Sequence, residues 1–97
     1  MRNPRFEKLL EKVLKLHNSK NTDYAEEGNP YSNFEFAAQF AGITVPEGFD
    51  YLIGVKQARL VNLRLSEKDP CHESIQDSLL DRAVYACLAA SYDMEDE

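Results

Sequence analysis

Apolar residues recur along this chain at the spacing of an α-helix, and this pattern constrains the fold more than any other feature. Between residues 4 and 20 the apolar positions are Phe6, Leu9, Leu10, Val13 and Leu16. At 3.6 residues per turn these positions share one face. Asn3 and Pro4 before them suit a cap and a first-turn residue. An amphipathic helix is therefore expected over residues 4–20.

A second, shorter helix is expected from Ser32 to about Ala41. Ser32 and Glu35 have the spacing of a capping box, and Asn29-Pro30 just before them is a turn signal. Gly42 follows the last apolar position and can end the helix in a left-handed conformation.

Two longer helices are expected in the second half of the chain. Residues 43–50 are interpreted as a connection, because the Val45-Pro46 step disfavours helix. Helical periodicity resumes over residues 51–66, and the last helix is expected from residue 72 or 73 to about residue 92. Short connections between four helices predict an all-α, compact bundle, completed by association of several copies.

Composition limits the kinds of protein that this chain can be. Its 97 residues, 43% of them hydrophobic, with only four Gly and four Pro, predict a single domain over residues 1–97 with a frayed acidic tail at 93–97. No apolar run approaches the ~20 residues that cross a bilayer, which argues against a membrane partner. A net charge of −6 argues against binding to duplex nucleic acid.

The two cysteines favour a reducing compartment. Cys71 and Cys87 form no CxxC pair, and a small secreted scaffold would carry more cysteines. The N-terminus lacks the hydrophobic region of a secretion signal. A cytoplasmic location in a bacterial host cell is therefore expected. Cys71-His72 does not match a zinc site, because adjacent ligands with no second cluster have the wrong spacing.

Two cations lie on an apolar stripe of the third predicted helix. Lys56 and Arg59 share a narrow sector with Leu52 and Leu63, so both are expected to point inward. A buried cation needs a carboxylate, an anionic ligand or a path to water. The sequence does not decide among these three possibilities for Lys56 and Arg59.

The last predicted helix carries Glu73, Asp77 and Asp81 at intervals of four residues. We refer to these three as the acidic series. It is expected to border the interior, with Ser74, Ser78 and Tyr85 on a wetter side. Carboxylates at this spacing repel one another, which Mg²⁺ or Mn²⁺ would offset. Salt bridges to Lys20, Lys56 and Arg59 would offset it equally well.

The stretch from Leu16 to Phe36 is polar but rich in aromatic residues. Lys20, Asp23 and Tyr24 follow closely on the apolar face of the first helix, and Asn33 offers both a donor and an acceptor. A base or sugar could stack on the aromatic rings here. A well-packed loop with Asn33 as a simple cap is the alternative.

Four segments together resemble a known family. They are "LHNSKNTDYA", "NPYSNFEFA", "GVKQARLVNL" and "ESIQDSLLDRAVYACLA", and they resemble small phage and prophage proteins of the nucleotide modification associated domain group. That group in turn is similar to MazG-like all-α NTP pyrophosphatases. The resemblance covers most of residues 14–90.

The resemblance implies an oligomeric all-α protein that cleaves a nucleoside triphosphate with Mg²⁺. By this resemblance Glu73 and Asp77 would hold the metal, and Asp81 or Asp23 would orient or deprotonate the water. Phosphate and base would be held by residues of the matching motifs and their neighbours: Lys20, Tyr24, Asn33, Lys56 and Arg59.

The chain departs from the MazG-like pattern at one point that concerns catalysis. Those enzymes carry an ExxE motif on one helix and an ExxD motif on the next, and the chain is interpreted as having neither. Three functions therefore remain open. They are an Mg²⁺-dependent (d)NTP pyrophosphohydrolase, a non-catalytic protein that sequesters a nucleotide or cyclic nucleotide against host defence, and a small helical adaptor.

Overall fold

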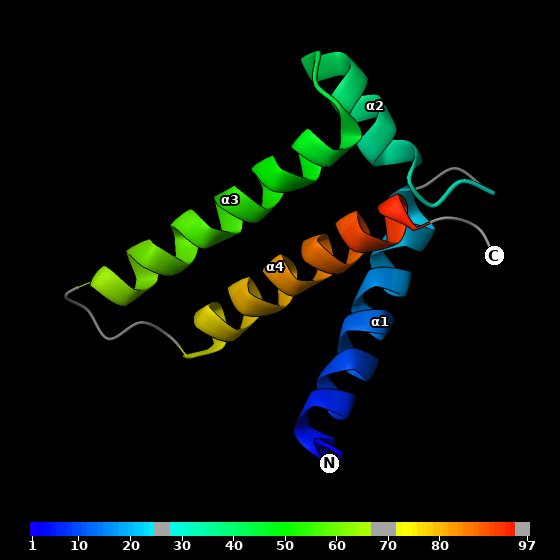
Figure 1. Ribbon diagram of the computed structural model, residues 1–97. Coiled ribbons are helices and arrows are strands. Elements are labelled where there is room, and N and C mark those ends of the chain that lie inside the picture. The colour runs from blue at the N-terminus through cyan, green and yellow to red at the C-terminus, as the bar shows by residue number, and fades with distance from the viewer. Residues whose placement is uncertain (25–27, 67–71, 95–97) are drawn as a thin grey trace.

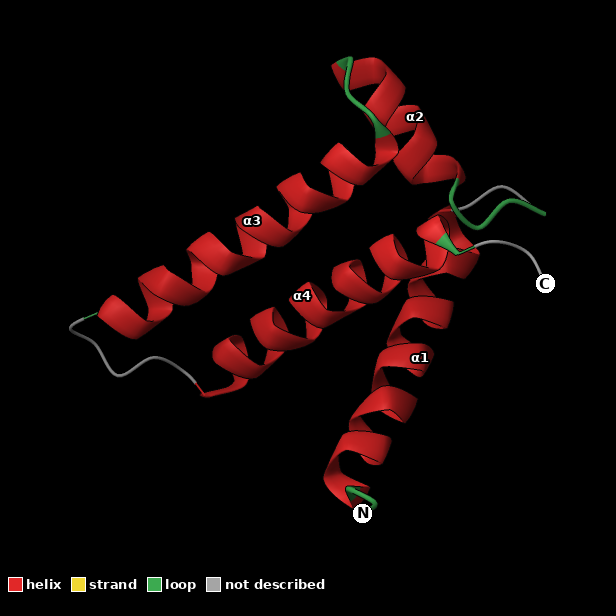
Figure 2. Cartoon of the chain, in the orientation of Figure 1, coloured by secondary structure: helices red, strands yellow, loops and turns green. Residues whose placement is uncertain are grey.

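Four helices make up nearly all of the described chain (Figures 1 and 2). The computed structural model describes residues 1–24, 28–66 and 72–94, without the side chains of residues 20–24 and 72–73. The helices are α1 (Pro4–Tyr24), α2 (Ser32–Ala41), α3 (Val45–Leu65) and α4 (His72–Asp93). They pack against one another, so the expected all-α bundle of four helices is confirmed.

Helix α1 begins as predicted and ends later. The side chain of Asn3 accepts a hydrogen bond from the backbone N–H of Phe6 at 3.1 Å, and Pro4 is the first helical residue. The helix continues to Tyr24. The segment with Lys20, Asp23 and Tyr24 is therefore the last turn of α1 and not a loop.

The predicted capping box at the start of α2 is wrong. The N-cap is Tyr31, which makes no side-chain capping bond, and Ser32 is already inside the helix. Asn29 organises the turn instead: its Oδ1 accepts from the Tyr31 N–H at 3.1 Å and its Nδ2 donates to Glu35 at 2.8 Å. Glu35 therefore pairs with Asn29, the residue that organises the turn before the helix.

The connection between α2 and α3 is shorter than expected. Gly42 ends α2 with a φ of 72°, as predicted, and its N–H returns to the carbonyls of the last turn. The interpretation of residues 43–50 as a connection is wrong, because α3 begins at Val45. Pro46 lies in the first turn, where the missing N–H would have no helical partner.

A capping box does exist, at the start of α3. The Thr44 hydroxyl accepts from the Glu47 N–H at 3.2 Å, and a Glu47 carboxylate oxygen accepts from the Thr44 N–H at 3.1 Å. The same oxygen accepts from the Thr44 hydroxyl at 2.9 Å. These bonds hold the pKa of Glu47 below its ordinary value of 4.5, the Thr44 backbone bond contributing most.

Helix α4 is the central element. It runs beside α3 along most of its length, and it packs against α1 on another side (Figure 1). Ser78 on α4 is fully buried and donates a hydrogen bond to the Ser74 carbonyl at 3.0 Å. The expectation that Ser78 lies on the wetter side of the helix is therefore wrong, because a helix flanked on two sides leaves little of its surface to water.

The buried apolar core of the described residues is small. Phe49 and Leu60 of α3 are almost fully buried, and Phe49 contacts the rings of Phe34 and Tyr92 at centroid distances of 4.9 Å and 6.2 Å. The remaining buried apolar side chains are Val13, Ala38, Leu80 and Leu88. Such a core joins all four helices but covers only part of each.

Candidate functional site

Lys56 and Asp81 form an ion pair between α3 and α4. The Lys56 Nζ lies 3.1 Å from the Asp81 Oδ2, and each side chain is 22% exposed. Both side chains therefore lie at the helix interface, as the sequence predicted. A carboxylate, an anionic ligand and a path to water were the three possibilities for Lys56, and the structure shows the carboxylate.

Arg59 does not accompany Lys56. Its side chain is exposed, so the expectation that it points inward is wrong. At 100° per residue Arg59 lies about 60° from Lys56, and this rotation carries it past the edge of the contact with α4. A different cation, Arg82 of α4, reaches across to α3 and donates to the side chain of Gln57.

The acidic series is divided by its surroundings. Asp77 is exposed, Asp81 is half-buried beside Lys56, and the side chain of Glu73 lies outside the described residues. Within the part of the chain that the structure describes, no three His, Cys, Asp or Glu side chains are grouped as metal ligands. A metal on Glu73 and Asp77 stays a prediction, and no chemical step is derived from it.

The other predicted ligand residues lie near the ends of α1 and α2. The backbone of Lys20, Asp23 and Tyr24 forms the last turn of α1, while their side chains lie outside the described residues. Asn33 is in the first turn of α2 and is exposed. The roles assigned to these four residues stay predictions.

The sequence interpretation missed one acidic pair. Because α3 begins at Val45, Glu47 and Asp50 lie within it at ExxD spacing. Glu47 is engaged in the capping box, whereas Asp50 is exposed. The signal that could have found this pair is the combination of Thr44, Pro46 and Glu47, which marks a helix start.

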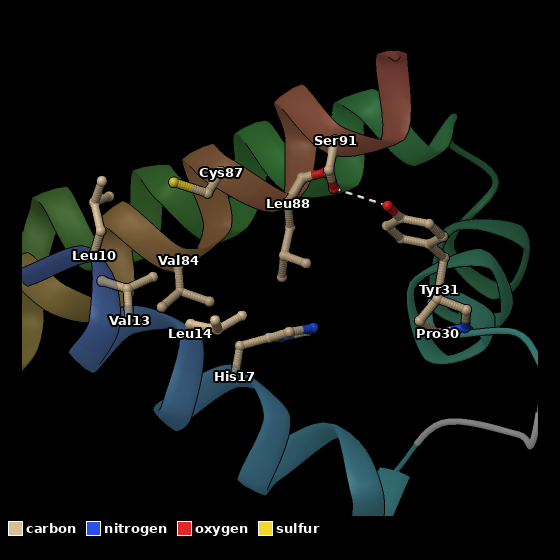
Figure 3. A pocket seen from close by; sticks show the side chains of 10 residues that line it. All are labelled: Leu10, Val13, Leu14, His17, Pro30, Tyr31, Val84, Cys87, Leu88 and Ser91. Atoms are coloured by element: carbon tan, nitrogen blue, oxygen red, sulfur yellow. Dashed lines mark hydrogen bonds between the residues drawn. The ribbon is translucent and has the colours of Figure 1, made fainter. Parts of the chain in front are cut away.

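A cavity lies where α1, the turn at residues 28–31 and the C-terminal half of α4 meet (Figure 3). Its volume is about 360 Å³. Ten side chains line it: Leu10, Val13, Leu14, His17, Pro30, Tyr31, Val84, Cys87, Leu88 and Ser91. Most of this lining is apolar, and the polar groups are few and gathered toward the turn.

The polar side of the cavity is held by a short hydrogen-bond chain. The hydroxyl oxygens of Tyr31 and Ser91 are 2.8 Å apart, and the Ser91 hydroxyl donates to the Leu88 carbonyl at 2.8 Å. Because Ser91 has one proton and gives it to the carbonyl, the Tyr31 hydroxyl is the donor to Ser91. The Tyr31 and Tyr92 rings also pack edge to face, with centroids 5.0 Å apart.

His17 supplies the remaining polar group. Its side chain is half-buried and extends from α1 into the space below Leu88, toward Pro30 and Tyr31 (Figure 3). The stretch from Leu16 to Phe36 thus contributes His17, Pro30 and Tyr31 to one wall. The sequence signalled this wall by placing polar and aromatic residues together, but it gave no sign that Ser91 faces them.

The cavity and the Lys56–Asp81 pair are separate. Asp81 and Ser91 are both on α4, about 15 Å apart along the axis at 1.5 Å per residue. They also face different neighbours, since Asp81 meets α3 and Ser91 meets the turn before α2. Of the predicted site residues whose side chains the structure describes, none lines the cavity.

Comparison with known proteins assigns no relative to the chain: no family model, curated protein or solved structure matches it. No helix of the described residues is both long and apolar enough to cross a membrane.

Proposed function

We propose that this chain is a nucleotide-binding protein whose ligand occupies the cavity between α1, the 28–31 turn and α4. The observation that carries the proposal is the cavity itself, about 360 Å³ open to solvent on one side, with mostly apolar walls and a polar arc of His17, Tyr31 and Ser91. Small-molecule sites typically have about 300–1,000 Å³ and this kind of lining. The resemblance supplies the ligand class, a nucleotide or cyclic nucleotide.

The proposed binding mode follows from the lining. The base or sugar packs against the aliphatic side chains of Val13, Val84 and Leu88, and His17 and Tyr31 contact its polar edge. Lys20 lies three positions after His17 on α1 and is assigned to the phosphate. Sequestration of the intact ligand requires only these contacts.

Mg²⁺-dependent pyrophosphohydrolysis is the second candidate, and it comes from the resemblance. The feature that favours it is Asp77, which is exposed one turn before Asp81 on α4. Asp81 is engaged by Lys56, which favours a structural role for that carboxylate. The helical adaptor is the third candidate, since a Lys56–Asp81 pair needs no ligand.

Binding is tested by isothermal titration of the full chain with dNTPs, NTPs and cyclic nucleotides, with and without Mg²⁺. We expect one nucleotide class to bind with a stoichiometry near one per chain. Val84→Phe, which fills the cavity, should weaken binding at least about tenfold, as should His17→Ala. Ala86→Phe, at an exposed position of α4 outside the cavity lining, is the matched control and should bind like the wild type.

The fate of the ligand separates the candidates. After incubation and denaturation, recovery of intact nucleotide supports sequestration. Release of pyrophosphate that is lost in Asp77→Ala supports the hydrolase. Failure of the whole panel to bind, or equal binding by wild type and Val84→Phe, contradicts the proposed site.

A further inference from the structure

Helix α3 is apolar on two opposite faces. Its inner face packs against α4 and α2 and contains the buried side chains of Phe49 and Leu60. The opposite side, here called the outer face of α3, consists of Tyr51, Gly54, Val55, Ala58, Val61, Asn62 and Leu65, all of them exposed. Only Asn62 among these seven is strongly polar. A helix that meets water along one side normally carries charges there, and a helix that is apolar all round is normally buried.

The exposure of the large side chains on this face is high. Tyr51 is 70% exposed, Val55 46%, Val61 42% and Leu65 77%. Single exposed apolar residues are common, but a stripe that follows one helix for four turns marks an interaction surface. The outer face is thus not covered by any of residues 1–24, 28–66 and 72–94, the part of the chain that the structure describes.

The accessible surface of the chain is larger than that of a compact monomer of the same mass. It is 7916 Å², whereas a folded monomer of this mass exposes about 5,700 Å². The outer face of α3 is one part of the excess of about 2,200 Å², since Phe36, Phe40 and Leu14 are also highly exposed. An obligate homodimer buries an area of this order per copy. The radius of gyration of 15.2 Å likewise exceeds the value of about 12.5 Å for a compact domain of this length.

The residues of the outer face fit a second copy of the same helix. Gly54 and Ala58 are one turn apart near the middle of the stripe, and open space surrounds Gly54 where a Cβ would be. Small residues at this spacing let two helix backbones approach closely. In an antiparallel pair centred on Ala58, Tyr51 of one copy would lie opposite Leu65 of the other.

Charge complementarity favours this direction. Asp50 and Arg64 are both exposed and lie on the same flank of α3, within about 40° at 100° per residue. An antiparallel pair about Ala58 brings Asp50 of one copy to Arg64 of the other, twice by symmetry. In a parallel pair Asp50 of one copy would lie about 21 Å along the axis from Arg64 of the other, so these pairs would not form.

We propose that the outer face of α3 is a self-association surface, on which a second copy lays its own α3 antiparallel about a two-fold axis near Ala58. This proposal does not depend on the ligand. The homodimer would bury the apolar stripe and complete the small core of each copy.

The test is analytical ultracentrifugation of the ligand-free full chain over the micromolar range. We expect a dimer for the wild type. Ala58→Arg should weaken self-association roughly a hundredfold, because two like charges meet at the axis. Ala86→Arg, the same change at an exposed position of α4, should leave the dimer intact, and circular dichroism should show equal helix content in all three proteins.

A charge exchange tests the direction of the pair without touching the apolar stripe. Asp50→Arg and Arg64→Asp should each weaken the dimer about tenfold, and the double variant should regain most of the loss. A monomeric wild type overturns the proposal. So does a dimer that Ala58→Arg leaves unchanged, or a double variant weaker than both single variants.

Discussion

At the scale of single residues, Lys56 and Asp81 show what helical spacing can predict about the direction of a side chain. Helical spacing placed each of them on a stripe that faces the interior, and the structure joins them at 3.1 Å. The same reasoning failed for Arg59 and Ser78. Spacing gives the angle of a side chain around its helix axis, but the edge of the buried sector depends on how the neighbouring helix crosses.

The ion pair should behave as a structural contact. Lys56→Met or Asp81→Leu alone breaks an ion pair whose side chains are each 22% exposed, so each should lower the free energy of unfolding by about 1–2 kcal/mol. The double variant should be closer to wild type than either single variant. Urea unfolding at neutral pH measures all four proteins.

A nucleotide titration of the double variant gives the functional control. Under the proposed cavity site, Lys56→Met with Asp81→Leu keeps its affinity for the ligand. A loss of affinity for the nucleotide without a loss of stability would show that Lys56 and Asp81 belong to the binding site.

At the scale of elements, the four helices were predictable, but the start of α3 and the residues that cap α2 were not. Apolar periodicity gave four helices, and Gly42 ended α2 as expected. Helix α2 begins at Ser32 as expected, but its capping box was predicted wrongly, because Ser32 and Glu35 match the pattern while Asn29 organises the turn. The start of α3 was not predicted, because the Val45-Pro46 step by itself disfavours helix. Thr44 and Glu47 nevertheless cap a first helical turn, in which proline is tolerated.

The α3 capping box makes a prediction about stability. Thr44→Ala removes the hydroxyl that accepts from the Glu47 N–H, and should lower the free energy of unfolding by about 1 kcal/mol at neutral pH. Thr44→Ser keeps an equivalent hydroxyl and should lose only a fraction of that. Equal stability of wild type and Thr44→Ala would show that the cap does not hold α3.

The same box predicts the sign of a pH effect. Hydrogen bonds from Thr44 hold the pKa of Glu47 below 4.5 in the folded chain. The stabilisation from the charged carboxylate is thus fully present above pH 4.5 and is lost as the pH falls through the lowered pKa. Glu47→Gln has no charge to lose at this position, so its stability relative to wild type should rise on acidification.

At the scale of the whole molecule, the candidate site could be predicted only in part. The stretch from Leu16 to Phe36 suggested a ligand-contacting region, and His17, Pro30 and Tyr31 do line the cavity. Val84, Cys87, Leu88 and Ser91 complete it from α4. Because α4 is apolar over much of its circumference, the sequence did not show which of its sides meets α1 and which meets α3.

The large exposed surface belongs to the same scale. Under the proposed self-association, a chain with 7916 Å² of accessible surface and a small core would gain much of its stability by burying apolar area against a second copy. We therefore expect the unfolding midpoint to rise with protein concentration. Thermal melts at two concentrations, tenfold apart, measure this rise, and Ala58→Arg should abolish it.

The most direct test of the central claim is a nucleotide titration followed through the backbone amides by NMR, which a chain of 97 residues permits. The proposed site predicts that one nucleotide class gives saturable shifts around residues 13–17, at Tyr31 and over residues 84–91. The amides of Lys56, Arg59 and Asp77 should move little. Shifts confined to Lys56, Arg59 and Asp77, or no shifts with any nucleotide, would contradict it.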